Sequence, residues 1–199
     1  MLENSQRQDL CRFFARVFNY PDRSLVEDLR EEVAGVAKLL AAAQPQLTPF
    51  PRLEDLEISY TELFISRVGG VPAPPYGSVY LEQEKQLMGQ TTLCALRAYQ
   101  GEGLSHEDGG DPPDFIATEM EFLYFLIGKE ITALAQGLLA EAHTARQKQI
   151  DFANTLVLPW VDQFCTRIKE VTGAAELYHW SADRLKAFSV RPGGLRPVG

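Results

Sequence analysis

Residues 114–134 read DFIATEMEFLYFLIGKEITAL, and this stretch decides the fold class. Its apolar residues recur every three or four positions, which places them on one face of a helix. They are Ile116, Met120, Leu123, Tyr124, Ile127, Ile131 and Leu134. Asp114 stands where an N-cap is expected, because its side chain can accept a hydrogen bond from a backbone N–H of the first turn. The stretch therefore predicts a long helix that begins at a capping aspartate.

The same helical spacing recurs on both sides of this stretch. Helices are predicted to begin after the capping residue Asp22 and at Pro51, because proline is tolerated in a first turn. A further helix is expected over residues 82–99, with a break where Gly89 stands, and Pro159 should kink or restart a later one. Strand-type alternation of useful length is missing. The sequence therefore predicts an all-α protein.

Length and composition predict one folded unit. The chain has 199 residues, of which 45% are hydrophobic and 23% are charged, so there is enough apolar material for a core. We expect a single-domain helical bundle over residues 1–190 and a flexible C-terminal tail over 191–199. No apolar run approaches the roughly 18 residues of a membrane span. The net charge of −8 argues against nucleic acid as a partner.

The cysteines and the N-terminus indicate the compartment. Three cysteines that lie far apart in the sequence fit neither a disulfide framework nor a zinc cluster, and they suit a reducing environment. The first residues lack the basic, apolar and small-residue layout of a secretory signal. We therefore expect a cytoplasmic protein.

Acidic residues are concentrated between Ala98 and Gly128, a window without lysine or arginine. The window holds seven carboxylates: Glu102, Glu107, Asp108, Asp111, Asp114, Glu119 and Glu121. They are either a solvated loop and helix start, or a surface that attracts a cationic ligand or peptide. The sequence leaves both interpretations open.

Motifs of catalysis are missing from the sequence. It has no phosphate loop, dinucleotide fingerprint, HExxH or GxSxG. His106, Glu107, Asp108 and Asp111 could together bind a metal, but they lie in a glycine-rich loop without EF-hand spacing. We therefore expect no enzyme, no cofactor and no metal site. A metal-dependent hydrolase that uses the His106–Asp111 loop is kept as an alternative.

Two loops combine proline stiffness with aromatic side chains. One is Pro72–Tyr80, which contains three prolines and two tyrosines, and the other is Asp111–Phe115. Both could be rigid connectors whose tyrosines pack inward. Alternatively, they frame one groove with aromatic walls and a carboxylate rim. Such a groove would suit a peptide with basic residues followed by an apolar stretch.

Several short motifs occur in an order that resembles a known family. They are Tyr60-x-x-Leu63-Phe64, PPYGSVYLEQE from Pro74 to Glu84, Met88-Gly89, Tyr99, Gly103, Pro113-Asp114 before Glu119, Glu121 and Phe122, and Leu158-Pro159-Trp160 followed by Phe164. In this order they resemble the TorD/DmsD/NarJ family of redox-enzyme maturation chaperones. The resemblance covers about residues 8–190 and is greatest for the DmsD and TorD branches.

The resemblance implies an all-helical TorD-like chaperone of the cytoplasm. Such a chaperone binds the twin-arginine leader of a molybdopterin-dependent oxidoreductase precursor, holds back its export and assists insertion of the molybdenum cofactor. Proteins of molybdenum-cofactor biosynthesis are further candidate partners. The implied leader-binding residues are Pro74, Pro75, Tyr76, Gly77, Ser78, Tyr80, Glu84, Pro113 and Asp114, and we add Phe115 as part of an apolar wall.

This chain departs from the family pattern at two positions. Phe115 and Leu156 stand where the family usually has histidines. Proton-linked or nucleotide-linked behaviour that needs those imidazoles is therefore not carried over. An alternative within the family is a nitrate-reductase-type assembly chaperone for a catalytic subunit that is not exported. A further alternative, outside the family, is a bare helical scaffold. We expect a monomer or a dimer that swaps helices through the pliable segment Gly101–Gly110.

Overall fold

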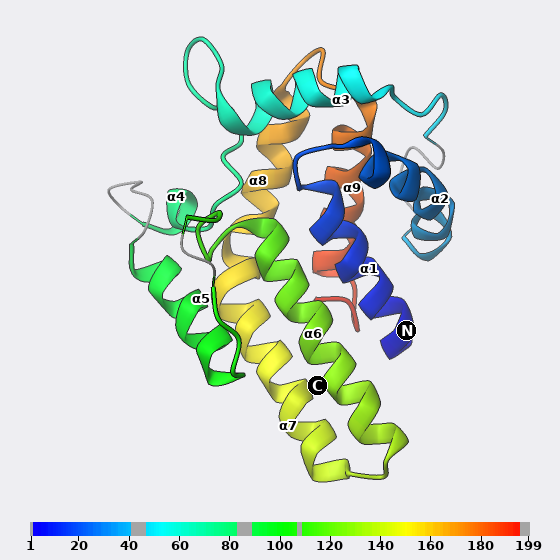
Figure 1. Ribbon diagram of the computed structural model, residues 1–199, viewed down its shortest axis with the longest axis vertical. Coiled ribbons are helices and arrows are strands. Elements are labelled where there is room, and N and C mark those ends of the chain that lie inside the picture. The colour runs from blue at the N-terminus through cyan, green and yellow to red at the C-terminus, as the bar shows by residue number, and fades with distance from the viewer. Residues whose placement is uncertain (1, 41–46, 83–88, 107–108, 196–199) are drawn as a thin grey trace.

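The computed structural model describes residues 2–40, 47–82, 89–106 and 109–195 (Figure 1). The helical elements are α1 (Asn4–Val17), α2 (Arg23–Leu39), α3 (Leu53–Tyr60), η1 (Thr61–Ile65), α4 (Ser78–Leu81), α5 (Gln90–Gly101), α6 (Ile116–Ala135), α7 (Leu139–Phe152), η2 (Ala153–Val157), α8 (Leu158–Glu170) and α9 (Glu176–Val190). The segments η1 and η2 are π-helical. No strand occurs within these ranges, which confirms the all-α prediction.

The stretch from which the sequence analysis began forms the centre of the fold. Helix α6 packs against α1 on one side and α7 on the other, and α8 continues the line of α7 after η2 (Figure 1). Half of the residues of α6 are buried, because its apolar stripe faces two neighbouring helices. The left-handed backbone of Gly137, with a φ of 74°, ends α6 and lets the chain reverse into α7.

Aromatic side chains join α1, α8 and α9 at one end of the central hairpin, which is formed by α6 and α7. Phe18, the C-cap residue of α1, meets Phe164 of α8 edge to face at 5.3 Å between ring centroids, and Phe14 of α1 stacks on Phe188 of α9 at 5.8 Å. Such pairs add about 0.5–1.5 kcal/mol beyond the burial of their surface. The described elements therefore share one continuous core.

Several predicted helix boundaries are confirmed. Asp22 caps α2, since its carboxylate accepts the N–H of Leu25 at 2.9 Å. Pro159 lies in the first turn of α8, directly after the π-helical residues 153–157, so the helix restarts there. None of the described helices is long and apolar enough to cross a membrane.

Two predicted helix starts are wrong. Helix α3 begins at Leu53, and Pro51 precedes its N-cap residue Arg52. The helix expected over 82–99 begins only at Gln90, because Glu82 has an extended backbone and Gly89 is the N-cap of α5. Residues 83–88, which lie between them, are outside the described part of the chain.

The C-terminal segment packs more closely than the sequence suggested. Leu195 is buried, and its N–H donates to the carbonyl oxygen of Phe188 at 3.2 Å. The guanidinium of Arg191 donates to the carbonyl oxygen of Leu39. Residues 191–195 of the expected flexible tail therefore lie against the helical body, and 196–199 are outside the described residues.

Candidate functional site

The two proline-stiffened loops lie together, as the interpretation of a shared groove required. Tyr76 and Phe115 form an isolated antiparallel bridge. The N–H of Gly77 donates to the carbonyl oxygen of Asp114, and the N–H of Ile116 donates to that of Pro75, each at 2.9 Å. Backbone hydrogen bonds thus fasten the loop before α4 to the start of α6.

The carboxylate of Asp114 reinforces this junction. Asp114 is fully buried, and its Oδ2 accepts the N–H of Ser78 while its Oδ1 accepts the hydroxyl of Thr92, each at 2.7 Å. The side chain therefore connects α4, α5 and the start of α6. The expectation that Asp114 caps α6 or stands on a rim is wrong, because Phe115 is the N-cap and the carboxylate points into the core.

The aromatic residues at the junction pack inward more than expected. Phe115 is only 2% exposed, and its ring lies 5.6 Å from that of Tyr76. It is therefore unable to form the exposed apolar wall assigned to it. Tyr76 is half-buried and donates its hydroxyl to Oδ1 of Asp111 at 3.1 Å. Burial, reinforced by Asp111, raises the pKa of Tyr76 to about 12, so its hydroxyl stays a donor.

Trp160 lies behind the Pro72–Tyr80 loop and limits the space at Gly77. Tyr80 stacks on the fully buried Trp160 with 5.1 Å between centroids, and the guanidinium of Arg167 lies 4.7 Å from the Tyr80 ring. A Cβ on Gly77 would lie 3.1 Å from Nε1 of Trp160, so a larger residue would need the loop or the indole to shift by a few tenths of an ångström. Pro75, Ser78 and Pro113 are also buried and Pro74 is half-buried, whereas Glu84 lies outside the described residues.

A second carboxyl group is buried beneath this junction. Glu119 of α6 is fully buried, and neither of its oxygens forms a hydrogen bond of ordinary geometry in the described part of the chain. Burial raises its pKa well above the usual value, and the neighbouring Asp114 raises it further. The indole N–H of Trp160 offsets part of this effect. The site therefore favours the neutral acid at Glu119.

The acidic window is not the uncompensated charged surface that its composition suggested. Glu102 pairs with Lys129 and Lys148, and Asp114 and Glu119 are buried. Glu107 and Asp108 lie outside the described residues. Among the described carboxylates of this window, the exposed ones are Asp111 and Glu121.

An open groove lies beside the junction. It has a volume of about 530 Å³ and lies between α5 and the segments Gly103–His106 and Gly109–Pro113. Its apolar lining is Leu93, Leu96, Leu104, Pro112 and Pro113, and its polar lining includes Thr92, Gln100 and His106. A second hollow of about 250 Å³ shares Leu104 and His106 and is lined by Glu121 and Phe125. Glu121 therefore lies in the wall of the second hollow, whereas Asp111 stands in the chain between Gly110 and Pro112 of the groove lining.

Sequence reasoning missed the contribution of α5 to this groove. Leu93 is 46% exposed on α5, and it was not singled out because a leucine at helical spacing is usually a core residue. The sequence offered no signal for it, because the burial of Ala95, which places Leu93 on another face of α5, is seen only in the structure.

The residues that replace the family's usual histidines are both packed in the interior. Phe115 is 2% exposed, and Leu156, which lies in η2, is 5% exposed. Leu156 also lines a hollow of about 340 Å³ with Phe122 and Phe152. No group of three or more potential metal ligands occurs among the described residues, and the predicted loop set of His106, Glu107, Asp108 and Asp111 is only partly described.

Replacing Asp114 should destabilise the protein strongly. In Asp114→Ala, the N–H of Ser78 and the hydroxyl of Thr92 lose their partner inside the core. Each buried unpaired group costs about 1–3 kcal/mol, so we expect a loss of about 3–5 kcal/mol in the free energy of unfolding, measured by urea denaturation. Asp111→Ala, at an exposed carboxylate, should stay within about 0.5 kcal/mol. Equal effects of the two substitutions would contradict this account.

The raised pKa of Glu119 should make the free energy of unfolding decrease as pH rises. Its folded-state pKa is raised above the ordinary 4.5, so its stabilising contribution is full below pH 4.5 and is lost as pH rises through the folded pKa. Glu119→Gln should therefore flatten the dependence of the unfolding free energy on pH above pH 4.5. Glu27→Gln, an exposed change on α2, is the control and should keep the wild-type slope. An unchanged slope in Glu119→Gln would refute the assignment.

Sequence comparisons connect this architecture with assembly chaperones. The chaperone protein TorD of Psychrobacter sp. (strain PRwf-1) is 25% identical over 202 residues, covering 93% of this chain and 89% of the relative. A selenate reductase assembly chaperone protein of Thauera selenatis is 29% identical over 167 residues, covering 82% and 77%.

A structural comparison agrees in fold. A crystal structure described as that of a redox enzyme maturation protein from Archaeoglobus fulgidus matches with a TM-score of 0.54 and 24% identity, covering 90% of this chain and 93% of that one. At this identity the likeness shows the fold alone. The sequence model of the nitrate reductase delta subunit family matches residues 22–166, which include the junction, the groove and both helices of the central hairpin, α6 and α7. The chain therefore belongs to the nitrate reductase delta subunit family, the TorD/DmsD/NarJ group of redox-enzyme maturation chaperones.

Proposed function

We propose that this protein is a cytoplasmic chaperone that binds the twin-arginine leader of a molybdopterin-dependent oxidoreductase precursor. By holding the leader it delays export while the molybdenum cofactor is inserted. The relatives that are named as TorD and as a selenate reductase assembly chaperone support this class of client. The protein performs no catalysis in this proposal, because its work is done by binding.

The observation that carries the proposal is a partly apolar groove whose lining residues Gly110 and Pro112 flank the exposed Asp111 in the chain. An extended or helical apolar segment could bury side chains against Leu93, Leu96 and Leu104, at about 1.5–3 kcal/mol for each large side chain that is fully buried. Asp111 follows the groove lining in the chain and is exposed. An arginine of the leader suits it, because a guanidinium offers two parallel N–H donors to one carboxylate.

Stiffness of the groove wall supports binding of an unstructured leader. A leader loses conformational freedom when it binds, so the receptor surface contributes most if it loses little freedom of its own. Pro112 and Pro113 restrict the backbone of one wall, and the hydroxyl of Tyr99 donates to the carbonyl oxygen of Pro113 at 2.6 Å. Asp114 then fixes the same segment to α5. The wall is thus held by contacts that do not depend on the ligand.

A substitution in the groove should weaken leader binding. Leu93→Ser removes an apolar contact from a side chain that is already 46% exposed, so it should change folding little. We expect about tenfold weaker binding of a twin-arginine leader peptide by calorimetry, which corresponds to about 1.4 kcal/mol. Leu139→Ser is the matched control: Leu139 is 71% exposed at the start of α7, outside the groove lining, and its substitution should leave binding unchanged.

A second peptide separates the proposal from its alternative, the nitrate-reductase-type assembly chaperone. A peptide whose paired arginines are replaced by glutamines should bind less tightly to the wild type if the leader is recognised as such. Equal binding of both peptides, or equal effects of Leu93→Ser and Leu139→Ser, would contradict the proposal. Capture of a leaderless catalytic subunit without any affinity for the leader would favour a nitrate-reductase-type assembly chaperone. The monomer or helix-swapped dimer stays a prediction.

Asp111 should contribute through charge. Asp111→Asn keeps an oxygen that can accept the Tyr76 hydroxyl but removes the negative charge. Because exposed charges are screened within about 8–10 Å near physiological salt, the variant should lose more affinity for the leader peptide at 0.02 M salt than at 0.15 M. Asp9→Asn on α1, which removes the same charge from a side chain 60% exposed, is the control. A salt dependence equal to that of the wild type would rule out this role.

A further inference from the structure

A buried arginine lies between the central helices, away from the groove. Arg7 of α1 is 5% exposed, and its Nη2 donates to Oε1 of Gln149 on α7 at 2.7 Å. Its Nη1 donates to Oδ1 of Asn4 at 3.2 Å and lies 3.6 Å from the carboxylate of Glu130 on α6. Its Nε is buried without a hydrogen-bond partner in the described part of the chain. One donor of this guanidinium is thus left unused in the interior.

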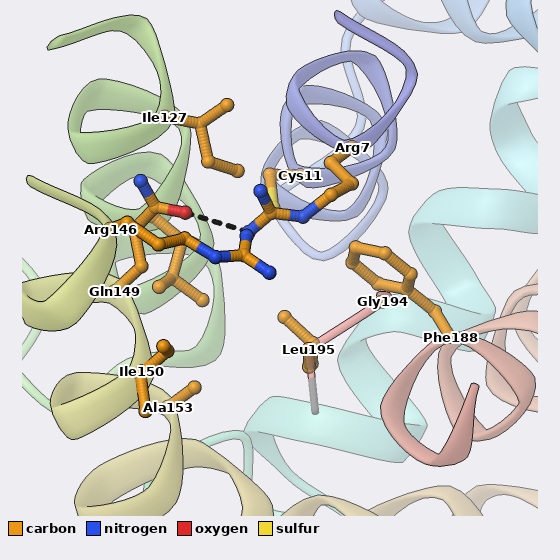
Figure 2. A pocket seen from close by; sticks show the side chains of 11 residues that line it. Arg7, Cys11, Ile127, Arg146, Gln149, Ile150, Ala153, Phe188, Gly194 and Leu195 are labelled. Carbon is orange, nitrogen blue, oxygen red and sulfur yellow. Dashed lines mark hydrogen bonds between the residues drawn. The ribbon is translucent and has the colours of Figure 1, made fainter. Parts of the chain in front are cut away.

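A second arginine approaches the first. Arg146 of α7 is half-buried, and in Figure 2 its guanidinium extends toward that of Arg7. Burial and the charge of Arg146 lower the pKa of Arg7 from its ordinary value. Within the described ranges, Arg146 forms no salt bridge with a carboxylate. Glu130 is therefore paired with Arg7 alone, and no described carboxylate pairs with Arg146.

The two arginines line a small cavity together with Gln149 and mostly apolar side chains. Its volume is about 10 Å³, the space of one water-sized body, and its walls include Ile127, Phe188 and Leu195 (Figure 2). Like charges repel strongly where apolar groups replace water, because the effective dielectric constant is low. A neutral occupant would not relieve this repulsion, whereas an anion would.

We propose that the cavity lined by Arg7 and Arg146 binds a single small monovalent anion such as chloride. Two positive charges stand against the one negative charge of Glu130, so one further negative charge balances the group. A multiply charged anion such as phosphate would exceed this balance. Guanidinium N–H groups, including the unpartnered Nε of Arg7, supply the hydrogen bonds that an anion needs.

Anion binding here would couple to the C-terminal segment. Gly194 and Leu195 line the same cavity as residues of α1, α6 and α7. An anion that reduces the repulsion between the two arginines would therefore stabilise the packing of this segment on the central hairpin. The site shares no lining residue with the groove of the proposed function, so each can be tested without the other.

The test compares anions at constant ionic strength. Thermal unfolding of the full chain is measured in sodium gluconate, chloride, bromide and phosphate, with Arg146→Gln and the exposed Arg97→Gln as matched variants. We expect chloride and bromide to raise the midpoint of the wild type and of Arg97→Gln by about 3–6 °C over gluconate, as a roughly tenfold excess over Kd would. Arg146→Gln should show no such rise and should be at least as stable as the wild type in gluconate, because the repulsion is removed.

Crystals soaked in bromide supply a second readout. An anomalous peak between the guanidinium groups of Arg7 and Arg146 is expected in the wild type and not in Arg146→Gln. The proposal is overturned if gluconate or phosphate stabilises the wild type as much as chloride does, if Arg146→Gln keeps the full chloride effect, or if no bromide peak occurs between the two side chains.

Discussion

The carboxylate of Asp114 is the interaction on which the rest of the site depends. Its two oxygens accept a backbone N–H from Ser78 and a hydroxyl from Thr92, and all of these groups are buried. A buried charge is tolerated only where hydrogen bonds replace its hydration, so the three segments must meet here. Their meeting determines the position of the wall formed by Pro112 and Pro113. The shape of the groove beside this wall therefore depends on the hydrogen bonds of Asp114.

Glu119 shows how strongly the surroundings control a carboxyl group. It lies close to Asp114 and is equally buried, but it has no comparable set of donors. Asp114 is stabilised by two short hydrogen bonds, whereas Glu119 avoids the cost of burial by favouring its neutral form. The loops, α5 and α6 are therefore joined over one hydrogen-bonded carboxylate and one carboxyl group that favours its proton.

The family relationship and the chain's own departures are physically compatible. Phe115 and Leu156, which replace the usual histidines, are buried in apolar surroundings, where an unpaired imidazole would be costly. The proposed recognition of a leader uses other groups, namely the leucines of α5 and the exposed carboxylate of Asp111. A chaperone that relies on apolar burial and a carboxylate needs no imidazole to bind its client.

The sequence alone determined the all-helical fold, many of its helix boundaries and the family, since these depend on local spacing, on caps such as Asp22 and on short motifs in order. It also brought the two proline-rich loops into one hypothesis. Tertiary structure decided what the acidic residues do. Asp114 accepts an N–H from Ser78, 36 residues away, and Glu102 meets Lys148, 46 residues away. The local sequence does not give the distance between residues so far apart in the chain, nor the burial of their side chains. These two quantities decide whether a carboxylate is a helix cap, a buried hydrogen-bond acceptor or an exposed charge.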